Sequence, residues 1–358
     1  MKTYNVIDLF AGVGGLTYGF STLPEFNIIF ANEIDRDIAI AYTLNHPNVA
    51  MMNCDIYDLT KEKIEEILSG QKVDIILGGP PCQSYSTLGK RRMDDRAHLF
   101  IQYKRVLQIL MPKVFVFENV VGILSMDKGR LFEQVKREFA ELGYGLKYKV
   151  LDAVDFGVPQ HRERVILVGF QNHNNFQYPL PTHGEGLKAY VTLREAIGDL
   201  PVLKSGEHSQ AYAHPANNEF LQFVRNNGDR LTEHAAPTNG EHLIKLMEAL
   251  KDGQSKDDLP EELRPKSGYR NTYAKLWWDK PSTTITRNFS CPSSSRCIHP
   301  RDSRAMSIRE GARLQSFPDD YQFYGTDGMK RLEIGNAVPP LLSLAIAKQM
   351  LKALSSEE

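Results

Sequence analysis

Short apolar runs alternate with amphipathic stretches along the first half of the chain. Four of the runs have the length and composition of buried parallel strands, and they lie at residues 5–10, 27–31, 73–77 and 113–117. Between and after them, apolar residues recur at helical spacing at residues 37–45, 61–68, 99–110 and 132–142. This alternation predicts an α/β fold with a doubly wound parallel sheet, which two further strands at residues 147–151 and 164–170 would complete.

The alternation stops after Phe170. From there to Ser209 the chain is rich in Asn, His, Pro, Gly and Ser, which predicts a domain boundary. A second, smaller domain is expected to follow, although no clear period or repeat fixes its fold. The last apolar segment, residues 341–354, predicts an amphipathic helix that follows Pro339 and Pro340 and rejoins the first domain.

The composition is that of an ordinary globular protein, because 42% of the 358 residues are hydrophobic. No apolar run reaches the roughly 18 residues of a membrane-spanning helix, and the N-terminus lacks the pattern of a cleavable leader, which predicts a cytoplasmic protein. The four cysteines include no Cys-x-x-Cys pair, so reduced thiols are expected. Cys291, Cys297 and His299 have no obvious fourth ligand beside them, and no metal is predicted.

The net charge of −1 gives no overall attraction to nucleic acid, but positive charge is concentrated in residues 264–313. That segment holds eleven Lys or Arg residues against three acids, with aromatic residues interleaved among them. Such a segment suits a surface that grips phosphates and packs against sugars or bases. From charge alone, a solvated face beside a small core is an equally good interpretation.

A glycine-rich turn, residues 8–15, directly follows the first predicted strand. Its backbone amides can approach a nucleotide-like ligand closely, and Thr17 stands where a dinucleotide fingerprint would have its third glycine, which argues against a nicotinamide cofactor. Glu33 follows the strand at 27–31, where an acid can accept the hydroxyl protons of a ribose, and Asp55 follows a short run at residues 51–54 at the next strand edge. Singly, each of these acids could instead cap a helix or lie in a solvated loop.

The loop at residues 78–86, Gly-Gly-Pro-Pro-Cys-Gln-Ser-Tyr-Ser, follows the strand at 73–77. Two prolines fix the approach of this loop and two glycines let it pass close to a substrate, so Cys82 is a candidate nucleophile rather than a buried apolar residue. Glu118 ends the neighbouring strand and could protonate or hydrogen-bond a ring nitrogen. Arg162 and Arg164 are expected to point to the same side of a strand and to offer guanidinium groups to a phosphate, a carboxylate or a base carbonyl.

These motifs together resemble the cytosine-5 DNA methyltransferase family over nearly the whole chain. The resemblance rests on the segments already described and on Asp94 to Phe100, Glu118-Asn119-Val120, Gln160 to Arg164, Arg309 to Pro318 and Gly335-Asn336-Ala337-Val338. It implies a Rossmann-like S-adenosylmethionine-dependent methyltransferase sheet with a smaller target-recognition domain. The implied division is a catalytic domain at 1–180 completed by 325–358, a target-recognition domain at 187–303 and a hinge at 304–324.

The resemblance also assigns candidate site residues. The implied catalytic residues are Cys82, Glu118, Arg162 and Arg164. The implied S-adenosylmethionine contacts are Phe10, Ala11, Gly12, Gly14, Gly15, Glu33, Ile34, Asp55, Ile56, Pro81, Leu99, Asn336 and Val338. The candidate DNA contacts are Gln83, Ser86, Arg270, Arg287 and Arg296.

The function that the resemblance implies is sequence-specific methylation of carbon 5 of a cytosine rotated out of double-stranded DNA, through a covalent adduct with Cys82. We expect a monomer that either belongs to a restriction-modification system, with a companion endonuclease, or acts alone. A transfer-RNA cytosine-5 methyltransferase built on the same catalytic domain is the alternative. A catalytically silent DNA-binding protein is a third class, which intact Cys82, Glu118 and Arg164 argue against.

Overall fold

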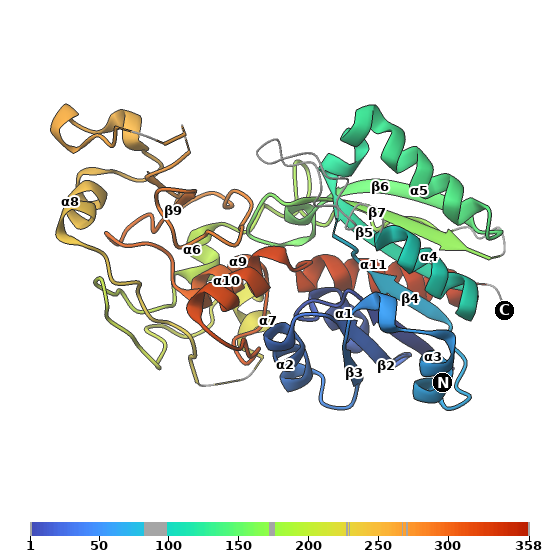
Figure 1. Cartoon of the computed structure of the whole chain (residues 1–358). Helices are drawn as coiled ribbons and strands as arrows, with labels where there is room; N and C mark the ends of the chain where they lie inside the picture. The colour runs from blue at the N-terminus through green and yellow to red at the C-terminus, as the bar shows by residue number, and fades with distance from the viewer. Residues whose placement is uncertain are drawn as a thin grey trace. The chain divides into compact units, whose positions relative to one another are not determined.

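The computed structural model describes residues 2–81, 99–171, 176–226, 228, 230–266, 268–269 and 271–356. Its main feature is a seven-stranded sheet in the order β3-β2-β1-β4-β5-β7-β6 (Figure 1). The strands are β1 (Tyr4–Leu9), β2 (Phe26–Glu33), β3 (Ala50–Asn53), β4 (Ile75–Gly78), β5 (Val114–Val120), β6 (Gly145–Asp152) and β7 (Glu163–Phe170). The apolar runs in the sequence therefore predicted the strands of this sheet.

The direction of one strand differs from the expectation of a parallel sheet. Strands β1 to β5 are parallel to one another, but β7 runs antiparallel to both of its neighbours, β5 and β6. The sheet is therefore mixed. Hydrophobic periodicity shows which residues are buried on a strand, but it carries no information about the direction in which the strand runs.

Helices cover both faces of the sheet. Because successive side chains of β1 point to opposite faces, their contacts show which helices lie on each face. Ile7 and Leu9 lie in a core cluster with residues of α3 (Lys61–Leu68), α4 (Leu99–Leu110) and α5 (Arg130–Ala140). On the other face, Asp8 contacts α1 (Gly15–Ser21), which packs on α11 (Pro340–Ser355); a Cβ built at Gly19 would lie 2.2 Å from the backbone nitrogen of Leu344. The remaining helix of this part, α2 (Arg36–Asn45), contacts β2 and β3.

The chain divides into two compact units. The first comprises Met1–Asp152, Glu163–Leu180 and Leu342–Glu358, and the second comprises Ala153–Arg162 and Pro181–Leu341. The second unit has little regular structure: α6 (Leu193–Ile197), α7 (Glu219–Arg225), α8 (Glu241–Ala249), α9 (Ile308–Leu314), α10 (Asp327–Asn336) and the short strands β8 (Ala274–Lys275) and β9 (Arg296–Ile298). Residues 325–341, which were expected to complete the catalytic domain, fall in this second unit. The functional division predicted from the sequence remains a proposal.

Buried ion pairs hold the second unit together around α9. Arg304 donates two hydrogen bonds to the carboxylate of Glu310, at 2.8 and 2.7 Å, and Glu310 also caps the helix through the backbone N–H of Ser307. Arg313 pairs with both Asp199 and Asp319. All five charged side chains are at most 3% exposed. The motif at 309–318 therefore has a structural role within its unit.

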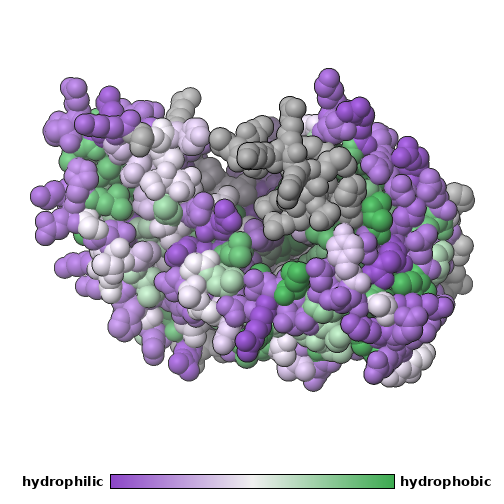
Figure 2. Space-filling view, in the orientation of Figure 1, coloured by the Kyte–Doolittle hydropathy of each residue, from purple (hydrophilic) through white to green (hydrophobic). Residues whose placement is uncertain are grey.

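No helix in the described part of the chain is long and apolar enough to cross a membrane. Figure 2 shows hydrophilic residues over most of the visible face, with hydrophobic residues in small separate patches.

Candidate active site

The glycine-rich turn begins where β1 ends, at the carboxyl edge of the sheet. Phe10, Gly12 and Gly14 have positive φ angles of 56°, 56° and 92°, which explains two of the glycines. The N–H of Ala11 donates to the carbonyl of Asn32 at 3.0 Å, so the turn is tied to the end of β2. A Cβ built at Gly12 would meet no atom within 4 Å, and the turn therefore faces open space that a ligand could fill.

Glu33 ends β2 and accepts two backbone hydrogen bonds. Its carboxylate receives the N–H of Gly12 at 3.0 Å and that of Asp35 at 2.9 Å. Burial raises the pKa of Glu33, and these two donors oppose that shift. Two of roughly four acceptor positions are therefore used, and a carboxylate in this state can still accept hydrogen bonds from ligand hydroxyls.

A buried acid, Asp8, lies behind the turn. It accepts a hydrogen bond from the hydroxyl of Thr17 at 2.6 Å, and that hydroxyl lies 3.1 Å from the hydroxyl of Tyr42. Burial raises the pKa of Asp8 to about 7, against the lowering effect of the Thr17 hydrogen bond. The residue at the third glycine position of a dinucleotide fingerprint thus serves here as a hydroxyl donor.

The third edge feature is the segment after β3. The side-chain amide of Asn32 donates to the carbonyls of Met52 and Cys54, at 3.0 and 2.9 Å, and so fixes this segment against β2. Asp55 accepts the N–H of Tyr57 at 3.1 Å as a helix cap, which leaves its second oxygen for a ligand. Ile34 is 63% exposed, whereas Ile56 is 3% exposed and belongs to the core. Only the main chain of Ile56 can therefore meet a ligand.

Glu118 of β5 and Arg164 of β7 form an ion pair that was not predicted from the sequence. Nε of Arg164 lies 2.8 Å from the Glu118 carboxylate, and the two side chains are 11% and 13% exposed. A Cβ at Gly79 would lie 2.8 Å from Oε2 of Glu118, and the side-chain amide of Asn119 donates to the carbonyl of Pro80 at 2.9 Å. The chain leading to the Pro-Pro-Cys-Gln loop therefore passes directly over Glu118.

Part of that loop lies outside the described residues. Pro81 is the last described residue before the gap and is exposed. Cys82, Gln83 and Ser86 lie outside the described part of the chain, as does Asp94 in the motif leading to Phe100. Leu99 begins α4 and packs against the core of the first unit.

Arg162 does not share the environment of Arg164, which corrects the expectation that both arginines point to one side. It precedes β7, is 1% exposed, and donates to the carbonyls of Ile285, Gly335 and Ala337 at 2.8 to 2.9 Å. Strand alternation does not apply here because β7 begins only at Glu163. Arg162 instead holds the loop that presents Asn336, which is exposed, while Val338 is 7% exposed.

The basic segment also offers less surface charge than its composition suggests. Lys275, Arg304, Arg309 and Arg313 are each at most 4% exposed, so they do not belong to a basic surface. The guanidinium group of Arg296 donates to the carbonyls of Gly253 and Lys275 and is half-buried. Among the predicted DNA contacts, Arg287 is exposed and Arg270 lies outside the described residues.

Several residues that shape the site were not predicted from the sequence. Thr17, Tyr42 and Asn119 position the turn and the loop through hydrogen bonds. A polar residue beside a strand end or within an apolar helix face could have identified them, because a buried polar group needs a hydrogen-bond partner. In the described part of the chain, no three side chains of His, Cys, Asp or Glu come together as a metal site.

The chain is similar to a protein family and to several known proteins. The family model described as C-5 cytosine-specific DNA methylase matches residues 4–352. The type II methyltransferase M1.HphI of Haemophilus parahaemolyticus is 36% identical over 355 residues, which cover 98% of this chain and 87% of the relative. The type II methyltransferase M.DdeI of Desulfomicrobium norvegicum is 36% identical over 372 residues, covering 97% and 88%.

Solved structures agree on the fold. A protein described as a DNA modification methyltransferase encoded within an E. coli prophage superimposes with a TM-score of 0.82 at 24% identity, over 99% of this chain and 100% of the other. A mutant DNMT2 of Spodoptera frugiperda gives a TM-score of 0.62 at 17% identity, over 99% and 100%. The fold class expected from the sequence is confirmed.

Proposed function

The chain belongs to the family of C-5 cytosine-specific DNA methylases, and from that premise we propose how its own residues divide the work of the reaction. The protein is a DNA cytosine-5 methyltransferase, and its methyl donor is S-adenosylmethionine. The residues at the carboxyl edge of the first unit's sheet are proposed to carry both the binding and the chemistry.

The turn and the two following strand ends suit the donor. The open space at Gly12 accommodates a nucleoside close to the backbone, and Glu33 has acceptor positions for the ribose hydroxyls. The free oxygen of Asp55 suits an adenine amino group, and exposed Ile34 suits the face of the ring. S-adenosylmethionine supplies an electrophilic methyl group on a sulfonium. Phe10, Ala11, Gly14, Gly15, Ile56, Pro81, Leu99, Asn336 and Val338 are further proposed contacts.

The chemistry that these residues perform is activation of a weak carbon nucleophile. The thiolate of Cys82 would add to carbon 6 of the cytosine while Glu118, in its protonated form, donates a hydrogen bond to nitrogen 3, so that electron density moves to carbon 5. S-adenosylmethionine held at the strand ends would supply the methyl group to carbon 5, and its sulfur would leave with the bonding electron pair as a neutral thioether. Loss of the carbon 5 proton to a base and elimination of the thiolate regenerate the aromatic ring. Arg164 fixes the Glu118 carboxylate and holds the base, and Arg162 positions the loop that carries Asn336.

The observation that carries the proposal is the Glu118–Arg164 pair lying directly beneath Gly79. The distance of 2.8 Å and the low exposure of both side chains fix the carboxylate beside Gly79, three residues before Cys82 in the sequence. A carboxylate held in this way is preorganised for a pyrimidine ring.

The experiment is bisulfite sequencing of duplex DNA incubated with the purified protein and S-adenosylmethionine, beside a Cys82→Ala variant. We expect protected cytosines within one short sequence for the wild type and none for the variant, which should still bind the donor. Undiminished methylation by Cys82→Ala would overturn the mechanism. Cys54→Ala is the matched control, because Cys54 lies after β3 and is expected to leave turnover intact.

The substrate is DNA, and the alternative of transfer-RNA methylation is not favoured, since the family is named for DNA and the relatives are named type II methyltransferases. We propose that the duplex is read by residues 187–303 while the target cytosine is rotated out of the stack. We further propose a cytoplasmic monomer paired with a restriction endonuclease of the same specificity. Size-exclusion chromatography checks the monomer, and protection of methylated DNA from a co-encoded nuclease checks the pairing.

A further inference from the structure

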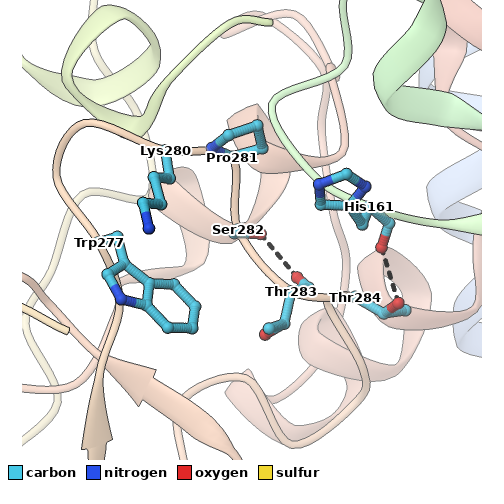
Figure 3. Close-up of a pocket in the computed structure, with 7 residues that line it drawn as sticks. All are labelled: His161, Trp277, Lys280, Pro281, Ser282, Thr283 and Thr284. Atoms are coloured by element: carbon cyan, nitrogen blue, oxygen red, sulfur yellow. Dashed lines mark hydrogen bonds between the residues drawn. The ribbon is translucent and has the colours of Figure 1, made fainter. Parts of the chain in front are cut away.

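An open depression of about 510 Å³ lies within the second unit, and none of the residues assigned above to chemistry lines it. Its lining consists of His161, Trp277, Lys280 and the run from Pro281 to Thr284 (Figure 3). Its volume lies in the range of about 300 to 1,000 Å³ that is typical of small-ligand sites. All seven residues belong to the same compact unit.

Trp277 forms one wall of the depression, and positive charge surrounds its ring. The guanidinium group of Arg296 lies 4.2 Å from the ring centroid, and Nζ of Lys280 lies 5.9 Å from it. Gly253 permits this placement, because a Cβ there would lie 2.3 Å from Nε1 of Trp277. Arg296 is held in turn by the carbonyls of Gly253 and Lys275, so the indole rests on a fixed support.

The opposite wall carries hydroxyl groups on a backbone that is tied down. Ser282 exchanges backbone hydrogen bonds with Pro159 and His161, both at 2.9 Å. The hydroxyl of Ser282 donates to the carbonyl of Thr283 at 2.7 Å, and the hydroxyl of Thr284 donates to the backbone carbonyl of His161 at 2.7 Å. Within the described part of the chain, the hydroxyl of Thr283 has no hydrogen-bond partner.

Negative charge is absent from the described lining of this depression. The nearest acid in sequence, Asp279, is engaged by Arg194 at 2.5 and 2.9 Å. For Lys280, no carboxylate partner occurs among the described residues. The depression therefore combines a cation, a hydroxyl donor and a flat aromatic wall, which is the chemistry that recognises a phosphate with its attached sugar.

We propose that this depression binds one nucleotide unit of the DNA strand, with the phosphate on Lys280 and the Thr283 hydroxyl and the deoxyribose against Trp277. The inference rests on the proposed function, since it concerns how the methylated DNA is held. The composition of residues 264–313 predicted a general phosphate-binding surface, and the proposal assigns the phosphate contact to Lys280 and Thr283 instead. Four of the cations counted there are buried, but Lys280 is exposed.

The chain offers a direct probe, because Trp277 and Trp278 are its only tryptophans. Trp278 is 7% exposed and does not line the depression, and Trp278→Phe leaves Trp277 as the single tryptophan. We expect duplex DNA carrying the recognition sequence to change the emission of Trp278→Phe, and inorganic phosphate or a free deoxynucleotide to do so only at far higher concentration. An unchanged emission at saturating DNA would overturn the proposal, as would a response to the free nucleotide at concentrations equal to those of DNA.

Two substitutions test the phosphate contacts. Lys280→Gln should raise KM for DNA roughly fivefold, leave kcat and KM for S-adenosylmethionine within about twofold, and lower the slope of log affinity against log salt by about 0.9. Thr283→Val should raise KM for DNA about threefold. Lys352→Gln, at an exposed position of α11 outside residues 187–303, is the matched control and should leave KM unchanged.

The outcomes separate this proposal from the proposed function. If wild-type protein methylates DNA but Lys280→Gln and Thr283→Val match Lys352→Gln, the depression does not hold the strand and the inference is wrong. If wild-type protein does not methylate DNA at all, the proposed function is wrong. A loss of activity in Lys280→Gln through kcat alone would also contradict the inference.

Discussion

The buried acids of the two units respond to burial in opposite ways. In the first unit, burial raises the pKa of Asp8 to about 7 and also raises the pKa of Glu33, because their partners are a hydroxyl and backbone amides. In the second unit, guanidinium partners lower the pKa values of Glu310 and Asp319 despite equally deep burial. The acids at the ligand edge of the first unit thus keep free hydrogen-bond acceptor positions, whereas the acids of the second unit are structural counterions to arginine.

This difference fixes the sign of each unit's response to pH. A carboxyl group whose pKa is raised by folding stabilises the folded state at low pH, and that stabilisation is lost as pH rises through the folded pKa. A carboxyl group whose pKa is lowered by folding stabilises the folded state at pH values above its unfolded pKa. That stabilisation is lost as pH falls through the folded pKa. Acidification therefore favours the Asp8 site and weakens the ion pairs around α9.

The largest effect is expected from breaking an ion pair of the second unit. Arg313→Met leaves Asp199 and Asp319 buried without their cation, which should cost about 3 to 5 kcal/mol of unfolding free energy. Thermal unfolding by circular dichroism should show a fall in Tm of about 10 °C. Lys245→Met, at an exposed site, is the control. A Tm equal to that of the wild type would show that the pairs do not hold this unit.

The next effect concerns the raised pKa of Asp8. Wild-type stability should decline between about pH 4 and pH 7 relative to Asp8→Asn, because the folded wild type retains a proton that the unfolded chain releases. The gap between the two unfolding free energies should grow by on the order of 3 kcal/mol across that range. Urea titrations at several pH values measure it, with exposed Asp58→Asn as control. A constant gap would contradict the shift.

A smaller effect is expected at the ligand edge itself. Glu33→Gln retains an acceptor for the Gly12 amide but loses charge toward the ribose, so affinity for S-adenosylmethionine should fall about tenfold. Isothermal titration calorimetry measures it. Glu65→Gln on α3, where the side chain is 61% exposed, should bind as the wild type does. Equal affinities for all three proteins would remove Glu33 from the donor site.

The same contrast explains which parts of the fold and of the site could be predicted from the sequence. Strands β2 and β5 are mostly apolar, so hydrophobic periodicity located them and placed Glu33 at the end of β2 and Glu118 near the end of β5. In the second unit, Arg304, Arg309 and Arg313 lie in the interior, and a hydropathy pattern assigns arginine to the surface. The separation of Arg162 from Arg164 depends on where β7 begins, a boundary that alternation alone does not define.

The central claim is that Glu118, fixed by Arg164 at the sheet edge, activates the cytosine ring, and Glu118→Gln tests it most directly. Single-turnover methylation of duplex DNA should slow by about 10² to 10⁴-fold, while affinity for S-adenosylmethionine measured by calorimetry stays within about twofold. A methylation rate within about twofold of the wild type would contradict the account.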